Sequence, residues 1–389
     1  MARSKSNTVI VEAKRTPIGK RNGVFKNLKA HELGGALIKS VLNAWGHRVD
    51  EVIMGNMIGV SFDAAQGLRP RLNPAMEACI KAGYGFIHGW TCGDACSSAL
   101  KSVIVGDRSI RSGDCSSVLA GGMESMSGLP KEWLAMVLKD PNDLSPLHPT
   151  DYFSHGFTTL EAGEWCAKYC GVSRQDLDNW AIKSYLRARK AQTDGVFNTQ
   201  IVPINEVALD EEPTLPITED MILKAAPKLG PDGTITYYTA SKNADGASVV
   251  WLMDPTFAKK RGFQPLAEIV SQAPSQTIHR DTRHFTVEPL QAIHAALQKA
   301  DLSLSDVDIF EINAPFAPVI VHAIRQLGIS EELVNIYGDS IAFGHPVGAS
   351  GAILLVRAIY ALLATGGRYA VICLCHALGG ATAMVIRRM

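Results

Sequence analysis

The chain has 389 residues, of which 47% are hydrophobic and 20% charged, so it can bury the cores of two or three ordinary domains. Lys and Arg number 38 and so do Asp and Glu, and this zero formal net charge argues against nucleic-acid binding as the main task. No run approaches the roughly 20 apolar residues of a membrane-spanning helix, and the first residues lack a signal-peptide core. Eight cysteines do not make a disulfide scaffold in so long a chain, so we expect a cytoplasmic protein.

Two similar α/β segments are predicted in chain order, one in each half of the chain. The pattern of the first segment predicts four elements. They are a strand over 9–11, a second strand over 49–55, a helix with a glycine stop over 96–113 and an all-apolar strand over 117–122. The second predicts the same succession over 266–270, 305–311, 349–367 and 369–375. The offset of about 255 residues indicates a duplicated domain and not a solenoid. Strands that are apolar on both faces indicate a sheet covered by helices.

An insertion separates the two halves, over about residues 123–240. It contains a predicted helix over 161–170 and a long amphipathic helix that begins at Ser173 and ends near residue 192. A proline- and acid-rich run over 209–216 predicts an extended loop. Long insertions of this kind often carry the residues that grip a substrate.

Cys96 lies where a loop turns into the first repeated helix. The free N–H groups and the dipole of a helix N-terminus stabilise a thiolate, although cysteine is also a common small core residue. His345 lies in the segment Gly344-His345-Pro346-Val347-Gly348, directly before the second copy of the helix. The repeat therefore makes His345 the counterpart of Cys96, and the two face each other if the halves pack about a pseudo-twofold axis. A purely structural histidine is the alternative.

Cys375 ends the last strand that the sequence predicts, and strand C-termini are where sites form in such sheets. Cys373 points to the same side of the strand and is predicted to be a core residue, whereas His376 points to the other side. Cys166 and Cys170 are four residues apart on a predicted helix, but no further ligands are suitably spaced, so no metal site is predicted. The sequence also contains no dinucleotide-binding glycine pattern and no P-loop.

Six segments, in order and over nearly the whole chain, resemble motifs of the thiolase family. They are EAKRTPIG at 12–19, CSSALK at 96–101, AGGMESMS at 120–127, NAPFA at 313–317, GHPVGASG at 344–351 and CHA at 375–377. The histidine segment matches the family motif nearly letter for letter. So many motifs in the right order argue strongly against a chance match.

The resemblance implies an α/β, thiolase-like fold with two duplicated halves in five layers, α-β-α-β-α, and an inserted loop domain. On this basis the N-terminal half is expected over 1–122, completed by about 241–262. The loop domain, which binds coenzyme A, is expected over 123–240, and the C-terminal half over 263–389.

The resemblance also implies thiolase chemistry. Cys96 is expected to attack a thioester or 3-oxo carbonyl and to carry the acyl group. His345 is expected to take the thiol proton, and Cys375 to exchange the proton on the carbon next to the carbonyl. Asn313 is expected to position a water in one oxyanion hole, and the N–H groups of Cys96 and Ala377 to form the second.

Coenzyme A is expected as a co-substrate, with no permanently bound cofactor. Its expected contacts are Ser241, Ala240, His155, Gly156 and Phe316. The family expectation is a homodimer or homotetramer that acts on acyl-CoA substrates. Some divergent thiolases work with a small zinc-ribbon/OB-fold accessory subunit, and such a partner would supply coenzyme A contacts that this chain lacks.

Two motif positions depart from the family pattern. The glutamate of the Asn-Glu-x-Phe-Ala motif is Ala314 here, and the glycine two residues after the last cysteine is Ala377. His376 is an unusual neighbour for Cys375. It either tunes that thiol or fills a gap against the backbone.

The predicted surroundings of the pocket differ as well. Tyr237-Tyr238-Thr239 replaces small residues, the acidic loop near Thr214 lacks the usual arginine, and Cys92-Gly93-Asp94-Ala95 departs from the family's segment before the nucleophile. Cys96, His345 and Cys375 are retained while the segments around them have changed. This combination favours a bulky, aromatic or branched acyl substrate, for example one like benzoylsuccinyl-CoA. Acetoacetyl-CoA is the alternative substrate.

Two other function classes stay open. A ketoacyl-synthase-like condensing enzyme shares the fold and the cysteine nucleophile, but it would place a histidine or asparagine where Cys375 stands; His376 keeps that class in view. A non-catalytic thiolase-like subunit of a complex is weakly supported by the lost motif glutamate. It is opposed by the retention of Cys96, His345 and Cys375.

Overall fold

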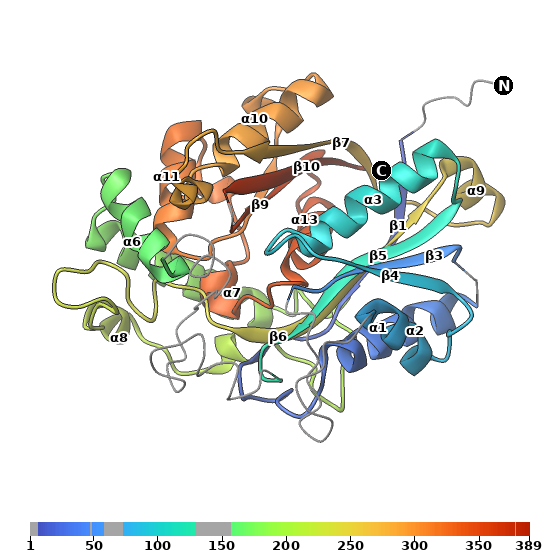
Figure 1. Cartoon of the computed structure of the whole chain (residues 1–389), viewed down its shortest axis with the longest axis horizontal. Coiled ribbons are helices and arrows are strands. Elements are labelled where there is room, and N and C mark those ends of the chain that lie inside the picture. Colours follow the sequence, from blue (N-terminus) through green and yellow to red (C-terminus); the bar gives the residue numbers. More distant parts are fainter. Residues whose placement is uncertain (1–6, 47–48, 58–72, 129–156, 378) are drawn as a thin grey trace.

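Figure 1 shows the computed structural model of the chain, which describes residues 7–46, 49–57, 73–128, 157–377 and 379–389. Its strands run in the hydrogen-bonded order β4-β3-β5-β6-β1-β7-β10-β9-β8, and β2 pairs with β6. The strands of the first half are β1 (Val9–Arg15), β2 (Gly19–Lys20), β3 (Glu51–Gly55), β4 (His88–Cys92), β5 (Ser117–Ser125) and β6 (Ala244–Met253). Those of the second half are β7 (Ala267–Gln276), β8 (Ile309–Ile312), β9 (Tyr369–His376) and β10 (Gly380–Arg388).

The two halves repeat the same strand pairing. In the first half β1 and β5 are both antiparallel to β6, and β5 is parallel to β3. In the second half β7 and β9 are both antiparallel to β10, and β9 is parallel to β8. The strands therefore correspond as β1 to β7, β6 to β10, β5 to β9 and β3 to β8. This topology confirms the duplication predicted from the sequence.

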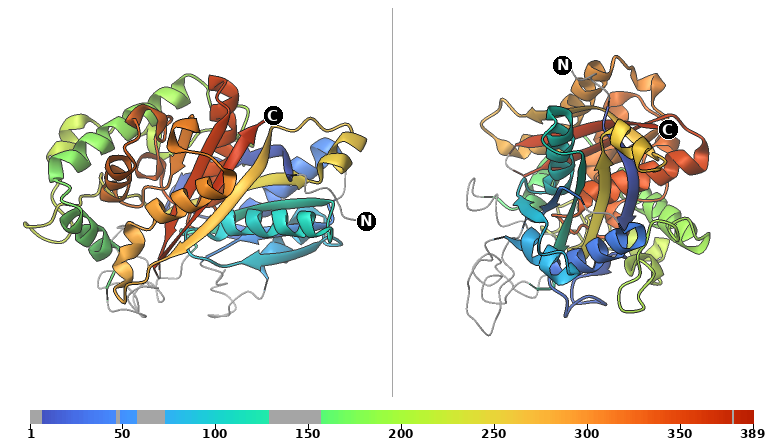
Figure 2. Two further views of the ribbon diagram at one scale, coloured as in Figure 1. Left: turned by 90° about the horizontal axis from the view of Figure 1, so that it is seen from above. Right: turned by 90° about the vertical axis from the view of Figure 1, so that its right-hand side faces the viewer.

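Helices form three layers around the strands (Figures 1 and 2). On one outer face α1 (Ala30–Trp45) and α2 (Pro74–Ala82) cover the first half. On the other, α10 (Pro289–Ala300) covers the second half with α11 (Ala317–Leu327) beside it. Between the two halves lie α3 (Ser98–Ser112) and α13 (Ser350–Thr365), which contact each other and the strands on either side. The expected α-β-α-β-α arrangement is confirmed.

The insertion folds as helices joined by long loops. It contains α6 (Thr159–Tyr169), α7 (Arg174–Thr193) and the short α8 (Glu219–Leu223). Reciprocal capping pairs fix the first two: Thr158 with Glu161, and Ser173 with Asp176. Apolar side chains of α6 and α7 share one buried cluster with side chains of the C-terminal half. The remaining α9 (Pro255–Lys260) and α12 (Ser340–Phe343) are short connections.

The prediction that the strand ending at Cys375 is the last one is wrong, because β10 follows it. Residues 381–388 contain a run of only four apolar residues, 383–386, which lies between Thr382 and two arginines, so the strand signal is short. They are nonetheless buried as far as Ile386, because β10 lies between β7 and β9. Among the described helices, none has both the length and the apolar character needed to cross a membrane.

Candidate active site

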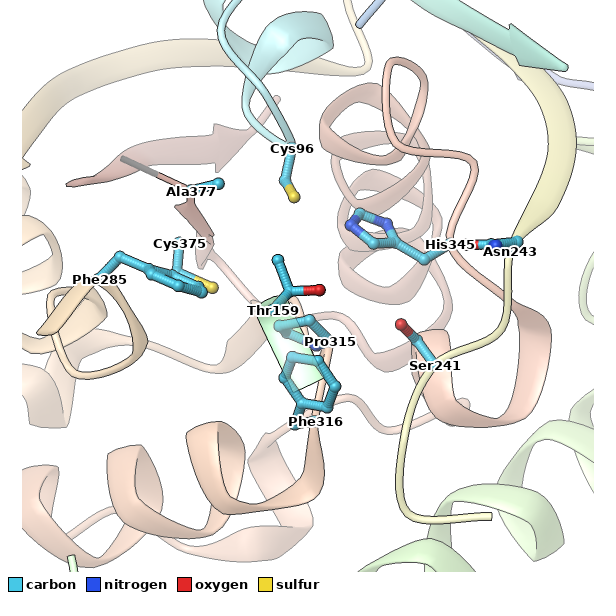
Figure 3. Close-up of a pocket in the computed structure, with 10 residues that line it drawn as sticks. All are labelled: Cys96, Thr159, Ser241, Asn243, Phe285, Pro315, Phe316, His345, Cys375 and Ala377. Carbon is cyan, nitrogen blue, oxygen red and sulfur yellow. The ribbon is translucent and has the colours of Figure 1, made fainter. Parts of the chain in front are cut away.

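Three separated segments bring Cys96, His345 and Cys375 to one pocket between the two halves (Figure 3). Cys96 precedes α3, His345 lies between α12 and α13, and Cys375 is near the end of β9. In Figure 3 the sulfur of Cys96 points into the space between the other two side chains. The pocket is lined by Cys96, Thr159, Ser241, Asn243, Phe285, Pro315, Phe316, His345, Cys375 and Ala377.

Cys96 sits in a tight turn directly before α3. Ala95 has a φ of 45°, in the left-handed region. Ser98 Oγ donates to the carbonyl of Ala95 at 2.6 Å and accepts from the N–H of Asp94 at 2.8 Å. The positive end of the dipole of this 15-residue helix lies next to Cys96 and stabilises negative charge there. The thiol therefore lies at a helix N-terminus, as the sequence predicts.

The hydrogen bonds of His345 leave it one basic nitrogen. Nδ1 is 2.6 Å from Ser350 Oγ, and that hydroxyl donates its own hydrogen to the carbonyl of Pro346 at 3.0 Å. Ser350 therefore accepts from Nδ1–H, so the proton of the neutral ring is on Nδ1 and Nε2 carries the lone pair. Nε2 lies 3.5 Å from Nδ2 of Asn313. An imidazole held in this way is suited to accept a proton from a thiol in the pocket.

Asn313 lies behind His345 and is held in a single orientation. Its Oδ1 accepts from Ser340 Oγ at 2.6 Å, so the amide nitrogen turns toward His345. Its backbone N–H donates to the carbonyl of Cys373 at 2.8 Å, which ties it to β9. Ser340 Oγ also accepts from the N–H of Ala314 at 3.3 Å. The residue that replaces the motif glutamate therefore contacts the same serine that orients Asn313.

Cys375 and Cys373 lie on one face of β9, as predicted. Both are buried and belong to the same core cluster, but only Cys375 lines the pocket. Burial raises the pKa of Cys373, which suits its expected core role. Ala377, two residues beyond Cys375, also lines the pocket.

His376 is packed against backbone. Its Nδ1 is 3.3 Å from the carbonyl oxygen of Ala377, and its ring lies so close to Gly380 that a Cβ there would be 2.1 Å from Cε1. Burial lowers the pKa of His376. These contacts match the gap-filling interpretation, and the ring is absent from the described pocket lining.

The segment 239–243 forms one wall of the pocket. The N–H of Ser241 donates to the carbonyl of Pro315 at 2.8 Å, and Ala240 pairs with Phe316. Ser241 and Phe316 line the pocket, whereas Ala240 lies behind it. Ser241 Oγ is buried and has no hydrogen-bond partner among the described residues, so it is open to a polar group of a ligand.

Glu124 ties the histidine segment to the first half of the molecule. One carboxylate oxygen accepts from the N–H of Gly348 at 3.0 Å and from the N–H of Met57 at 3.1 Å, and the other accepts from Asn56 Nδ2 at 2.8 Å. Gly122 passes so close to this segment that a Cβ there would be 2.0 Å from the carbonyl oxygen of Gly348. The Gly-Gly-Met-Glu run therefore supports the loop that carries His345.

Models of two known domain families together match nearly the whole chain. A model of the thiolase N-terminal domain matches residues 8–256, and a model of the thiolase C-terminal domain matches residues 263–388. The chain belongs to the thiolase family. Thiolases are acyltransferases, and the chain is an enzyme of this class.

Two relatives match this thiolase over nearly their whole length. The cytosolic acetyl-CoA acetyltransferase of Rattus norvegicus is 36% identical over 98% of both chains. The acetyl-CoA acetyltransferase of Escherichia coli is 34% identical over 98% of this chain and 99% of its own.

Two solved structures have a similar fold over nearly the whole chain. The Bacillus anthracis acetyl-CoA acetyltransferase has a TM-score of 0.88 at 30% identity and covers 100% of both chains. Human mitochondrial 3-ketoacyl-CoA thiolase has a TM-score of 0.86 at 30% identity and covers 98% of this chain and 99% of its own.

Some predicted residues of this thiolase cannot be placed and others fall outside the pocket. His155 and Gly156 lie outside the described residues. Cys166 and Cys170 have sulfur atoms 3.9 Å apart on α6. Within the described ranges no three histidine, cysteine or acidic side chains gather as a metal site.

Sequence reasoning missed four pocket residues, Thr159, Asn243, Phe285 and Pro315. Pro315 lies in a quoted motif, and Thr159 lies two residues before the helix predicted over 161–170, so both had a local signal. Phe285 lies in the 3₁₀ turn Thr282–Thr286, between β7 and α10, and nothing in its neighbours marks it as a pocket residue.

Proposed function

We propose that this thiolase cleaves a 3-oxoacyl-CoA with coenzyme A, or runs the reverse Claisen condensation, through an acyl group carried on Cys96. The observation that supports this most directly is the convergence of Cys96, His345 and Cys375 on one pocket. A nucleophilic thiol, a base and a second thiol for the α-carbon proton are the groups that this reaction needs.

In the proposed cleavage, Nε2 of His345 takes the thiol proton and Cys96 attacks the 3-oxo carbonyl. The tetrahedral intermediate collapses by breaking the bond between C2 and C3, and Cys375 gives its proton to C2, which leaves as acetyl-CoA. Cys96 keeps the acyl group. The Cys375 thiolate then takes the proton of a coenzyme A thiol, whose sulfur attacks the acyl group. The bond between the Cys96 sulfur and the acyl carbon breaks, and the Cys96 thiolate takes its proton back from His345.

Oxyanion stabilisation is assigned to two places in this proposal. The orientation of the Asn313 amide toward His345 supports a hole built from His345 and a water held by Asn313. The N–H groups of Cys96 and Ala377, which both border the pocket, would form the other. Coenzyme A would run past Ser241 and Phe316 toward the insertion.

The acyl group is the finer part of the proposal. Phe285, Phe316 and Pro315 give the pocket an apolar wall, which suits an apolar acyl chain. The departures from the family pattern in the segments around the pocket, together with the retained Cys96, His345 and Cys375, are the reason for proposing a bulky, aromatic or branched group. The relatives are named for acetyl-CoA, which makes acetoacetyl-CoA the competing substrate.

The test is thiolysis of a panel of 3-oxoacyl-CoAs, from acetoacetyl to long-chain, branched and aryl members. Wild type is compared with Cys96→Ser, and intact-protein mass spectrometry detects the acyl group on Cys96. We expect cleavage that depends on Cys96 and is fastest for a branched or aryl substrate. If acetoacetyl-CoA is fastest, the bulky-substrate proposal fails while the thiolase proposal stands.

Absence of any cleavage by the chain alone would contradict the proposed activity of the isolated chain. Adding a zinc-ribbon/OB-fold accessory subunit would then separate a two-subunit enzyme from a non-catalytic subunit. Decarboxylation of a malonyl thioester by wild type would instead support the ketoacyl-synthase-like class.

A further inference from the structure

Lys242 is a buried cation in the wall of the active site. It lies between Ser241 and Asn243, which both line the pocket, but its own side chain is only 6% exposed and is directed away from the lining. Charged side chains are rarely buried unless they are paired and hydrogen-bonded, because burial removes their hydration. The contacts of Lys242 therefore call for a specific role.

Lys242 holds the His345 segment at two points. Its backbone carbonyl accepts from the N–H of His345 at 2.8 Å. Its Nζ donates to the carbonyl of Ile341 at 2.8 Å, four residues earlier in the chain. Ile341 belongs to α12, which also carries Ser340, the residue that orients Asn313. One residue thus holds both ends of the turn that carries the proposed base, His345 through its backbone carbonyl and Ile341 through its side chain.

The insertion supplies the surroundings of the ammonium group. Nζ donates to the hydroxyl oxygen of Tyr185 on α7, and it lies 4.0 Å from a carboxylate oxygen of Glu212. It also lies 4.8 Å from the ring centre of Tyr185, 4.9 Å from that of Tyr237 and 5.8 Å from that of Tyr238. These rings stabilise a cation in a dry site. Neither oxygen of Glu212 has a hydrogen-bond partner among the described residues, so Lys242 is its main described counter-charge.

We propose that Lys242 is a positioning residue for this reaction. It links the insertion to His345 and Asn313 through the turn 341–345. It touches no reacting group, and it acts by holding Nε2 of His345 at the distance that proton transfer from Cys96 requires. The unusual Tyr237-Tyr238 pair then has a purpose, since its rings form part of the cage around the ammonium group. This inference rests on the proposed role of His345.

The test compares Lys242→Met, which keeps the length and loses the charge and donor, with Lys190→Met. Lys190 is an exposed residue of α7 paired with Asp194, and it serves as the matched control. We expect Lys242→Met to lower kcat for thiolysis by about 10- to 100-fold, because small displacements of a catalytic group are costly. KM for the 3-oxoacyl-CoA should change by less than about twofold. Lys190→Met should behave as wild type.

A double-mutant cycle separates positioning from a general structural effect. The rate of Cys96 alkylation by iodoacetamide is measured in wild type, Lys242→Met, His345→Ala and the double variant. If Lys242 acts through His345, Lys242→Met slows alkylation in wild type and adds nothing in the His345→Ala background. Additive losses in the double variant would overturn the proposal.

A milder variant covers the case in which Lys242→Met does not fold. Tyr185→Phe removes one acceptor of the ammonium group and keeps the ring, and it should lower kcat by a smaller factor that again disappears with His345→Ala. An unchanged kcat in both Tyr185→Phe and a folded Lys242→Met would refute the role. The alkylation cycle does not need turnover, so it still tests Lys242 if wild type fails to cleave any 3-oxoacyl-CoA.

Discussion

At the scale of single residues, the site depends on a short chain of hydroxyl contacts. Ser350 holds Nδ1 of His345 and Ser340 holds the amide of Asn313, both at 2.6 Å. Neither serine is itself a nucleophile or a base in the proposed reaction. Each fixes the orientation of a group that is, and orientation is a large part of what a protein contributes to acid–base catalysis.

Replacing Ser350 with Ala should lower kcat with little change in KM. The variant loses the acceptor that keeps the proton of His345 on Nδ1, so the fraction of neutral His345 rings with an unprotonated Nε2 falls. General base catalysis is worth about 10²- to 10⁴-fold, and we expect a loss of about 10- to 100-fold. Steady-state kinetics beside Ser112→Ala, an exposed serine of α3, gives the comparison. A Ser350→Ala enzyme with wild-type kcat would show that the tautomer needs no such support.

Sequence motifs pointed to the three side chains that the structure brings to one pocket, because Cys96, His345 and Cys375 each lie at an element end that the repeat marks. The supporting residues were harder to find. Lys242 reaches Ile341 only after the insertion folds against the second half, and no spacing along the chain signals that contact. The two interpretations of His376 could not be separated before its ring was seen to lie over Gly380.

At the scale of elements, strand β8 and helix α13 meet at a buried charge pair. Glu311 on β8 is fully buried, and its carboxylate is 3.7 Å from the guanidinium of Arg357 on α13. Neither carboxylate oxygen has a hydrogen-bond partner among the described residues. Burial therefore outweighs the attraction of Arg357 and raises the pKa of Glu311 to about 7.

This raised pKa predicts a specific pH dependence of stability. Between pH 4.5 and about 7 the folded protein keeps the Glu311 proton that the unfolded chain releases. The stabilisation from Glu311 is thus complete below pH 4.5 and is lost as the pH rises to about 7. Relative to Glu311→Gln, wild type should lose about 1.4 kcal/mol of unfolding free energy per pH unit in this window. Urea unfolding from pH 5 to 7.5 measures this loss, with a substitution of an exposed residue, Glu219→Gln, as the control. Parallel plots of unfolding free energy against pH for wild type and Glu311→Gln would contradict the prediction.

Element prediction succeeded where a single apolar pattern decided the outcome. Helices α3, α6, α7 and α13 have caps or glycine stops close to the predicted ends. Strand β10 was missed because its apolar run is only four residues long, and its burial comes from neighbours on both sides. A strand of this kind is defined by tertiary packing and not by its own hydrophobicity.

At the scale of the whole molecule, the insertion is joined to the central strands by a buried ion pair. Arg15 at the end of β1 makes two parallel hydrogen bonds to Asp210 of the insertion, at 2.7 and 2.9 Å. Asp210 also accepts from the N–H of Ile18 at 2.8 Å. Because of these contacts and the apolar cluster shared by α6, α7 and the second half, we expect the insertion to unfold together with the rest of the chain.

Removing Asp210 should therefore destabilise the whole chain and not the insertion alone. Asp210→Ala leaves the Arg15 guanidinium, whose side chain is 1% exposed, without its counter-charge. Breaking a buried pair in this way costs about 3 to 5 kcal/mol, whereas Asp194→Ala in the exposed Lys190 pair should cost less than about 1 kcal/mol. The Arg15→Met/Asp210→Leu double variant should recover much of the loss, because no charge is then left buried.

Urea unfolding followed by circular dichroism and by tryptophan fluorescence should show one shared transition, shifted to lower urea in Asp210→Ala. Two separate transitions would mean that the insertion unfolds on its own.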